Sequence, residues 1–396
     1  MMRVVIAPDK FKGSLSASAA AEAMARGVTR AAPSATIDRA PMADGGEGTV
    51  AALVASTGGT WREATVRGPM GEPVVARYGL LGDGRTAAIE MATASGLVLV
   101  PPDRRDPTIA TTIGTGELLL AAIADGASKV VVGIGGSATN DGGAGLGQAL
   151  SFRLLDAEGR ELPPGGGGLG RLDRIDGSSR RRELEGVSIA VACDVTNPLC
   201  GPRGASAVYG PQKGATPEMV ASLDANLSHF AAIVARDLGV SIAEIPGSGA
   251  AGGLGGGLVA FAGGRLQPGI DLVIEAVDLR ARLEGADLCL TGEGALDDQS
   301  AFGKTAVGVA RLARSMGIPT FALAGTIGEG ASATLEQGLD AYFSICPGPI
   351  ALDQAIARAG ELLEEATAMA LRAFLAGRRG GLGASARKGD GVGSGP

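Results

Sequence analysis

Short apolar runs alternate with helical patterns at both ends of the chain. The run "RVVIA" (3–7) is continuous and β-branched, which predicts a buried strand. The segment 14–32 that follows has helical periodicity, with Ser14 or Ser16 as its N-cap. Further strands are expected at 35–40, 286–292, 319–325 and 341–346, and further helices at 46–59, 303–316, 332–338 and 351–376. Strands that alternate with helices predict a parallel sheet covered on both faces.

The middle of the chain has a different pattern. Residues 60–92 read as antiparallel strands joined by glycine-containing turns, and a helix at 113–125 and a strand at 129–134 follow. We therefore expect an α/β fold of two dissimilar domains, with the active site in the cleft between them. Residues 1–65 plus 285–376 would form a discontinuous parallel-sheet domain, residues 66–284 an inserted second α/β domain, and residues 377–396 a disordered glycine-rich tail.

Composition excludes several classes of function. The net charge of −7 argues against nucleic acid as the main partner, because phosphate backbones require clustered cations. No window approaches about 18 uncharged apolar residues, and the N-terminus lacks a signal-peptide pattern. We expect a cytoplasmic protein that does not bind membranes. The four cysteines fit neither a disulfide framework nor a zinc site. The sequence is compatible with a homo-oligomer but does not indicate one.

The chain has a single histidine, His229, which lies in a segment with helical periodicity and is read as an ordinary helix residue. This reading of His229 argues against Ser-His-Asp catalysis and against histidine metal clusters. Acid–base chemistry must depend on carboxylates or lysines.

Five segments place glycines and polar residues directly after an apolar run. They are "APDKFKGSLS", "APMADGGEGT", "GIGGSATNDGGAG", "ACDVTNPLCGPRGASAVYGPQKGA" and "TGEGALDDQSAFGKT". Glycine-rich turns are common, but their recurrence suggests several backbone loops that converge on a polyanion. The loops also carry lysines as point charges and carboxylates for Mg²⁺ and for a general base, which is the combination that phosphoryl transfer requires.

Two familiar nucleotide-binding motifs are only partly matched. The Walker A pattern fails at "DQSAFGKT", because Asp298 stands where its first glycine should be. The dinucleotide fingerprint is matched by Gly133, Gly135 and Ala138 after a strand, with Asp156 as the later acidic residue. An NAD-dependent dehydrogenase of a small hydroxy acid therefore remains an alternative, as does a non-catalytic protein that binds sugar acids.

Taken in order, these five segments and "GAAGGLGGGL" resemble the bacterial glycerate kinase family, from about residue 2 to residue 375. The resemblance implies an ATP-dependent small-molecule kinase with two dissimilar α/β domains, one of them flavodoxin-like. It also implies ATP and Mg²⁺ as cofactors, D-glycerate as the substrate, and 2-phosphoglycerate and ADP as the products.

The same motifs supply the candidate site residues. For catalysis we expect Asp194 as the leading general base, with Asp44 and Asp141 as the next candidates, together with Lys10, Lys12 and Lys213. For binding of substrate or nucleotide we expect Gly135, Gly136, Ser137, Thr139, Asn140, Asp141, Asn197 and Lys304. For Mg²⁺ we expect Asp44, Glu47, Glu293 and Asp297. Whether the loop 133–145 approaches a phosphate or the glycerate carboxylate is left open by the sequence.

Overall fold

The computed structural model describes residues 1–301 and 304–386. The chain forms two compact units. Unit 1 comprises Met1–Met42 together with the segment that begins at Asp278, and unit 2 comprises Ala43–Val277. The sequence placed the boundaries near residues 65 and 285. The difference at the first boundary arises from helix α2 (Thr49–Thr57), whose Val50 and Val54 pack on Gly79 of unit 2.

Unit 1 contains a parallel sheet of five strands in the order β13-β12-β11-β1-β2. The strands are β1 (Arg3–Ile6), β2 (Thr36–Arg39), β11 (Leu288–Leu296), β12 (Thr320–Ile327) and β13 (Ala341–Ser344). Counted along the chain, this is the flavodoxin-like order 2-1-3-4-5, which confirms the α/β class and the flavodoxin-like expectation. The order reverses between β1 and β11, and ligands of such sheets bind at the carboxyl ends of the strands at this point.

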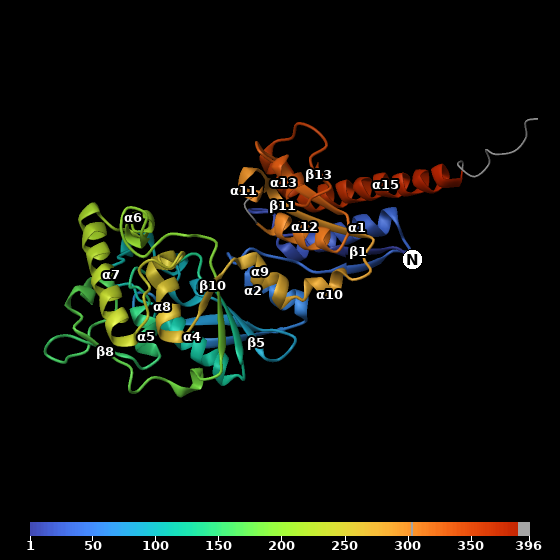
Figure 1. Ribbon diagram of the computed structural model, residues 1–396. Coiled ribbons are helices and arrows are strands. Elements are labelled where there is room, and N and C mark those ends of the chain that lie inside the picture. Colours follow the sequence, from blue (N-terminus) through green and yellow to red (C-terminus); the bar gives the residue numbers. More distant parts are fainter. Residues whose placement is uncertain (302–303, 387–396) are drawn as a thin grey trace, which may run out of the picture. The chain divides into compact units, whose positions relative to one another are not determined.

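Helices cover both faces of this sheet. The helices of unit 1 are α1 (Ala17–Ala31), α10 (Leu279–Leu283), α11 (Asp298–Ala301), α12 (Thr305–Ser315), α13 (Ala333–Glu336), α14 (Leu352–Ala357) and α15 (Ala359–Ala386). Helices α1 and α15 pack against each other over one face (Figure 1), and α12 packs against the opposite face. A Cβ atom at Gly27 of α1 would lie 2.7 Å from the Cβ of Thr367 of α15, so the glycine permits this close packing.

Helix α15 continues into the segment that the sequence assigned to a disordered tail. Its last residue is Ala386, and residues 387–396 lie outside the described part of the chain. Within this extension Arg378 donates to Asp287 at 2.7 Å and lies over the ring of Phe374. Extending an existing helix adds a hydrogen bond for each residue fixed, without the cost of nucleation. Residues 377–386 are therefore helical despite their glycines.

Unit 2 contains a mixed sheet of six strands in the order β10-β9-β6-β5-β4-β3. Its strands are β3 (Thr60–Arg67), β4 (Pro73–Leu80), β5 (Thr86–Glu90), β6 (Lys129–Gly133), β9 (Ser188–Ala192) and β10 (Arg265–Gln267). The first three form an antiparallel meander, as predicted, and the other neighbours are parallel. A separate antiparallel pair consists of β7 (Arg153–Leu155) and β8 (Arg174–Asp176).

The larger core of unit 2 lies on one face of its sheet. It is covered by α4 (Ile113–Ala124), α5 (Ala144–Ala149), α7 (Pro217–Leu238) and α8 (Leu254–Ala262). On the other face, α9 (Gly269–Ala276) covers a smaller cluster with Leu272. Further short elements are α3 (Ala92–Ser95), α6 (Ala205–Tyr209), and the 3-10 turns η1 (Leu97–Leu99), η2 (Pro102–Arg104), η3 (Gly166–Arg171), η4 (Arg182–Leu184), η5 (Pro211–Lys213) and η6 (Ala250–Gly253). His229 lies within α7, and its Nε2 contacts the carbonyl oxygen of Leu172 at 2.6 Å.

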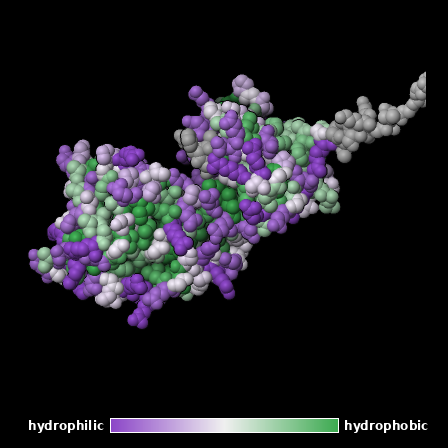
Figure 2. Space-filling model, in the orientation of Figure 1, coloured by the Kyte–Doolittle hydropathy of each residue, from purple (hydrophilic) through white to green (hydrophobic). Residues whose placement is uncertain are grey.

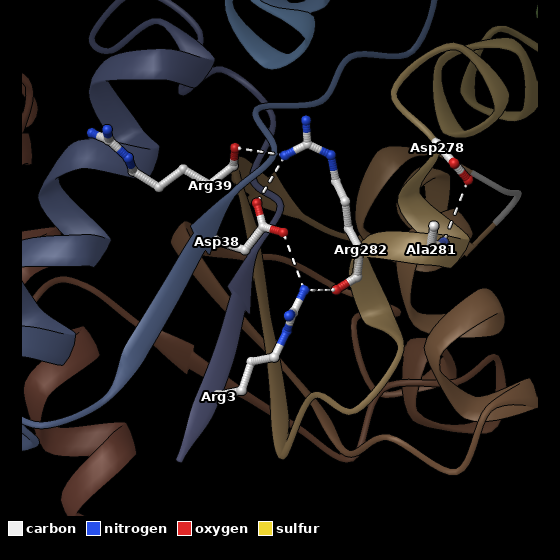
Figure 3. A network of polar contacts seen from close by, with 6 residues as sticks. All are labelled: Arg3, Asp38, Arg39, Asp278, Ala281 and Arg282. Carbon is white, nitrogen blue, oxygen red and sulfur yellow. Dashed lines mark hydrogen bonds and ion pairs between the residues drawn. The ribbon is translucent and has the colours of Figure 1, made fainter. Parts of the chain in front are cut away.

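A polar network in unit 1 joins the segments on either side of the inserted unit (Figure 3). The Asp38 carboxylate of β2 pairs with Arg282 of α10 at 2.8 Å and with Arg3 of β1 at 3.4 Å. Arg3 also donates to the carbonyl oxygen of Arg282 at 2.7 Å. Asp278 begins α10 with a positive φ of 51° and accepts a 3.4 Å bond from the Ala281 N–H. These bonds connect β2, the last strand before the inserted unit, with α10, the first helix after it.

The surface of each unit is of mixed polarity. Figure 2 shows hydrophilic residues over much of the visible face, with apolar residues between them. This is ordinary for a folded protein, because polar side chains alone cannot cover it. Among the described residues, no helix is both long enough and apolar enough to cross a membrane.

Candidate active site

Unit 2 contains a cavity of about 360 Å³ at the carboxyl ends of β6 and β9. Backbone from three of the predicted glycine-rich loops lines it, together with a few polar side chains. The lining residues are Gly45, Gly46, Leu97, Ile134, Gly135, Gly136, Ser137, Ala192, Cys193, Asp194, Val195, Tyr209, Gln212, Lys213, Ala250 and Ala251. A mostly apolar wall with few converging polar groups is typical of a small-molecule site.

Lys213 is the cationic residue of this cavity, and its side chain is only 2% exposed. Its Nζ donates to Ser137 Oγ at 2.7 Å and to the carbonyl oxygen of Thr139 at 2.6 Å. Burial lowers the pKa of Lys213 to about 7, and the negative charge of Asp141 opposes part of this shift. A buried ammonium with a perturbed pKa inside a cavity is a feature of functional sites.

The predicted glycine loop divides into two halves with different roles. Gly135, Gly136 and Ser137 line the cavity, and Gly136 has a positive φ of 75°. A Cβ atom at Gly135 would approach only Gly46, at 3.9 Å, so open space lies beside this residue. In the second half, a Cβ atom at Gly143 would lie 2.7 Å from the Cα of Gly257. The first half therefore leaves room for a ligand, whereas the second half allows close packing of the protein on itself.

Thr139, Asn140 and Asp141 are fully buried and lie outside the set of cavity-lining residues. The Asp141 carboxylate accepts bonds from the N–H and hydroxyl of Thr112, both at 2.9 Å, and from Gly143 N–H at 3.0 Å. Burial raises the pKa of Asp141, while these bonds lower it. Asn140 Nδ2 donates to Ser206 Oγ at 2.9 Å. These three residues, predicted as ligand contacts, make hydrogen bonds within the protein, but the buried Oδ1 of Asn140 has no partner among the described residues.

Asp194 follows β9 and lies on the cavity wall, as its position after a strand predicted. Its Oδ1 accepts a 2.8 Å hydrogen bond from the N–H of Gly269, the first residue of α9. Asn197, three residues later, accepts from the Tyr209 hydroxyl at 2.8 Å and donates to the Arg203 carbonyl oxygen at 2.8 Å. Asn197 therefore orients Tyr209, which does line the cavity.

The loop that contains Asp44 and Glu47 contributes Gly45 and Gly46 to the cavity wall. Glu47 is exposed, whereas Asp44 is partly buried and its Oδ1 accepts a 3.3 Å bond from the Gly46 N–H. Glu90, at the end of β5, holds this loop in place. Its Oε1 accepts from the N–H groups of Gly48 at 3.0 Å and Val50 at 3.1 Å.

A second polar group lies in unit 1 at the point where the strand order reverses. Asp9 follows β1, and its Oδ2 accepts a 2.6 Å bond from the Thr305 hydroxyl at the start of α12. Burial raises the pKa of Glu293, which lies in β11, to about 7, and Asp9 contributes to this rise. Lys10 is partly buried here, while Lys12 and Lys304 are exposed. Asp297 Oδ1 accepts from the Ser300 N–H at 3.2 Å.

The carboxylates predicted for Mg²⁺ are divided between the two units. Asp44 and Glu47 belong to unit 2, and Glu293 and Asp297 belong to unit 1. Over residues 1–301 and 304–386, no group of three or more His, Cys, Asp or Glu side chains is arranged to hold a metal ion. Each unit therefore supplies two of the four predicted carboxylates.

The dehydrogenase alternative is not supported by the structure of the fingerprint segment. Helix α5 begins only at Ala144, six residues after Ala138, and the Asp141 carboxylate already accepts from Gly143 and Gly145 at its N-terminus. In a dinucleotide-binding turn the pyrophosphate occupies this position.

Three residues near the sites were not singled out by the sequence. Tyr209 lies within the quoted segment 192–215 but was not named as a candidate residue, although it lines the cavity. Asp9 stands beside Lys10 in the first motif, and its spacing after β1 was the available signal. Glu90 ends a strand and lies outside every glycine-rich motif. Its bond to the Gly48 N–H joins segments that are distant in the sequence, so no local pattern predicts it.

Comparison with known proteins gives a consistent result along the whole chain. The model of the Glycerate kinase family matches residues 4–375. The glycerate kinase of Bacillus subtilis (strain 168) is 53% identical over 363 residues, which cover 92% of this chain and 95% of the relative. The glycerate 2-kinase of Escherichia coli (strain K12) is 49% identical, with 89% and 93% covered.

A crystal structure from Salmonella typhimurium LT2, which carries the provisional name glycerate kinase 2, superposes with a TM-score of 0.88 at 47% identity. The match covers 96% of this chain and 99% of that chain. A family match over nearly the full length, together with such relatives, leaves one assignment: this chain belongs to the glycerate kinase family.

Proposed function

We propose that the protein transfers the γ-phosphoryl group of ATP to the 2-hydroxyl of D-glycerate, giving 2-phosphoglycerate and ADP. The observation that carries the proposal is the cavity of unit 2, where a buried lysine and a carboxylate, Lys213 and Asp194, line the same small space in a chain of this family. The name of the Escherichia coli relative supports the 2-hydroxyl as the acceptor.

In this reaction Asp194 is the general base that accepts the proton of the attacking hydroxyl. Its bond to Gly269 fixes one carboxylate oxygen and thereby orients the other. Phosphoryl transfer needs mainly positioning and charge neutralisation, so the base contributes modestly compared with the cations. Lys10, Lys12 and Lys304 are proposed to neutralise phosphate charge, since they lie in segments that follow β1 and β11, the two strands at which the strand order reverses.

One or two carboxylates from among Glu293, Asp297, Asp44 and Glu47 would hold Mg²⁺, and the ion would supply positive charge to neutralise the phosphates of ATP. The buried Oε1 of Glu293 has no hydrogen-bond partner among the described residues, and a cation would satisfy it. A cytoplasmic location is part of the proposal, since ATP is the co-substrate and all four cysteines are free thiols.

A coupled assay of ADP release tests this function. ADP release should require both D-glycerate and Mg²⁺, and phosphorus NMR should identify the product as 2-phosphoglycerate. Reduction of NAD by glycerate without ADP release would contradict the kinase assignment. A product that is 3-phosphoglycerate would contradict only the site of phosphorylation.

A further inference from the structure

The cavity of unit 2 contains a set of unused hydrogen-bond donors. Among the described residues, the backbone N–H groups of Gly135, Gly136 and Ser137 have no hydrogen-bond partner. Gly136 adopts a positive φ of 75°, the type of local conformation that gathers successive N–H groups into a concave anion-binding nest. Lys213 Nζ, bonded to the Ser137 hydroxyl at 2.7 Å, brings a cation to the same place.

Lys213 also has an N–H donor that its two hydrogen bonds leave unused. An ammonium group has three N–H donors, and two of them are used by Ser137 and Thr139. No partner for the third is found within the described part of the chain. Burying such a group is unfavourable unless its charge and donors are satisfied. A ligand oxygen with negative charge satisfies both.

We propose that this cavity is the acceptor subsite of the enzyme, in which Lys213, Ser137 and the 135–137 backbone bind the carboxylate of the hydroxy acid. The inference rests on the proposed function. It adds that the hydroxy acid, and not the nucleotide, binds in the cavity of unit 2. The nucleotide phosphates bind elsewhere.

Charge balance favours a single carboxylate over a triphosphate here. Among the described residues, Lys213 is the one cationic residue in the lining of the cavity, and the Asp194 carboxylate lines the same wall. A triphosphate would bring several negative charges against one lysine and one opposing carboxylate. Glycerate brings one negative charge, which the lysine neutralises, and its hydroxyl groups are suitable donors to Asp194.

The protein's own carboxylates also occupy the nearby helix N-termini, where phosphate would otherwise bind. Glu90 accepts from Gly48 and Val50 at the start of α2, and Asp194 accepts from Gly269 at the start of α9. Helix N-termini are the usual backbone sites for phosphate, and carboxylates there repel it. The nest 135–137 therefore remains as the anion site of this cavity. The cavity volume of about 360 Å³ suits a small acid.

Calorimetric titration of the full chain without nucleotide tests the subsite directly. D-Glycerate should bind to the wild-type protein, whereas glyceramide, which lacks the carboxylate, should bind at least about 30-fold more weakly, the scale for losing one partner of a buried charge pair. The Lys213→Met variant should show the same loss for glycerate, and a smaller loss is expected for Ser137→Ala. ADP affinity should change less than threefold in both variants, and Lys129→Met, a substitution of a surface lysine, is the matched control.

The outcomes separate the subsite from the reaction. A Lys213→Met variant that loses ADP affinity but keeps glycerate affinity would overturn the subsite, as would equal binding of glyceramide and glycerate by the wild type. If Lys213→Met does not fold, the comparison of glycerate with glyceramide on the wild type decides. A wild-type protein that binds glycerate but never releases ADP would contradict the proposed function and leave the subsite standing.

Discussion

Asp194 accepts a 2.8 Å hydrogen bond from the backbone N–H of Gly269, so one oxygen of the carboxylate is fixed at the start of helix α9. The same side chain lines the cavity that contains Lys213. The proposed general base needs a fixed orientation, and the bond to Gly269 restrains one of its carboxylate oxygens.

The Asp194→Asn substitution should lower kcat by about 100-fold or more, the scale of general-base loss, without unfolding the protein. The asparagine can still accept from Gly269 through its amide oxygen, but it cannot take a proton. Steady-state kinetics and the midpoint of thermal unfolding, Tm, measure the two effects. Asp271→Asn, at an exposed position in the first turn of α9, is the control and should keep wild-type kcat. Wild-type kcat in Asp194→Asn would remove this residue from the mechanism.

Binding of glycerate should depend on the protonation of Lys213. Burial lowers the pKa of Lys213 to about 7, so roughly nine-tenths of the free enzyme carries a neutral lysine at pH 8. The bound carboxylate favours the charged form, so the complex takes up a proton above pH 7. The affinity for glycerate should then fall by about tenfold per pH unit above pH 7, as follows from linkage.

Calorimetry between pH 6 and pH 9, in buffers of different ionisation enthalpy, measures both the affinity and the proton uptake. The Lys213→Arg variant should bind with a flat pH profile, since a guanidinium stays charged throughout this range. Lys129→Met should keep the wild-type slope. An affinity of the wild type that is constant from pH 6 to pH 9 would contradict the role of Lys213.

Much of the fold could be predicted from local pattern. Strands such as β1 and β12 are short apolar runs, and Ser16 is the N-cap of α1, as the sequence indicated. The assignment of α2 to the wrong unit shows the limit of this approach. Alternation along the chain placed the helix at 46–59 in the same domain as β1 and β2, but Val50 and Val54 pack on Gly79 of β4 in the other unit.

The candidate site was predicted in part. The cavity does contain Asp194, Lys213 and residues 135–137, because loops after parallel strands meet at one edge of the sheet. Thr139 to Asp141 look like ligand contacts in the sequence, but their partners are Thr112, Ser206 and the backbone of Ala251. These partners are up to 112 residues away along the chain, so no local motif reveals them.

The Mg²⁺ requirement should identify which carboxylate contacts the metal. Asp44→Asn, Glu47→Gln, Glu293→Gln and Asp297→Asn are the four variants to compare. Loss of a real ligand should raise the Mg²⁺ concentration for half-maximal activity by about tenfold, the scale for a conserved metal contact, with little change in the glycerate KM. Asp103→Asn, at an exposed position in η2, is the control. An unchanged Mg²⁺ dependence in all four variants would refute the assignment.

Two glycines of unit 1 should respond oppositely to substitution by alanine. At Gly27 of α1 the new Cβ would lie 2.7 Å from the Thr367 Cβ, whereas at Gly377 of α15 no atom lies within 4 Å. Alanine stabilises an exposed helix position by about 1 kcal/mol relative to glycine. Gly377→Ala should therefore raise Tm slightly.

In Gly27→Ala the same propensity gain is opposed by overpacking, which costs about 1–3 kcal/mol, because α1 and α15 must separate to admit the methyl group. This variant should therefore lower Tm, because the new methyl group also meets the backbone carbonyl oxygen of Glu364, which cannot rotate away as a side chain can. Thermal unfolding followed by circular dichroism measures both variants and the wild type. A rise in Tm for Gly27→Ala equal to that for Gly377→Ala would show that the contact between α1 and α15 is looser than the structure indicates.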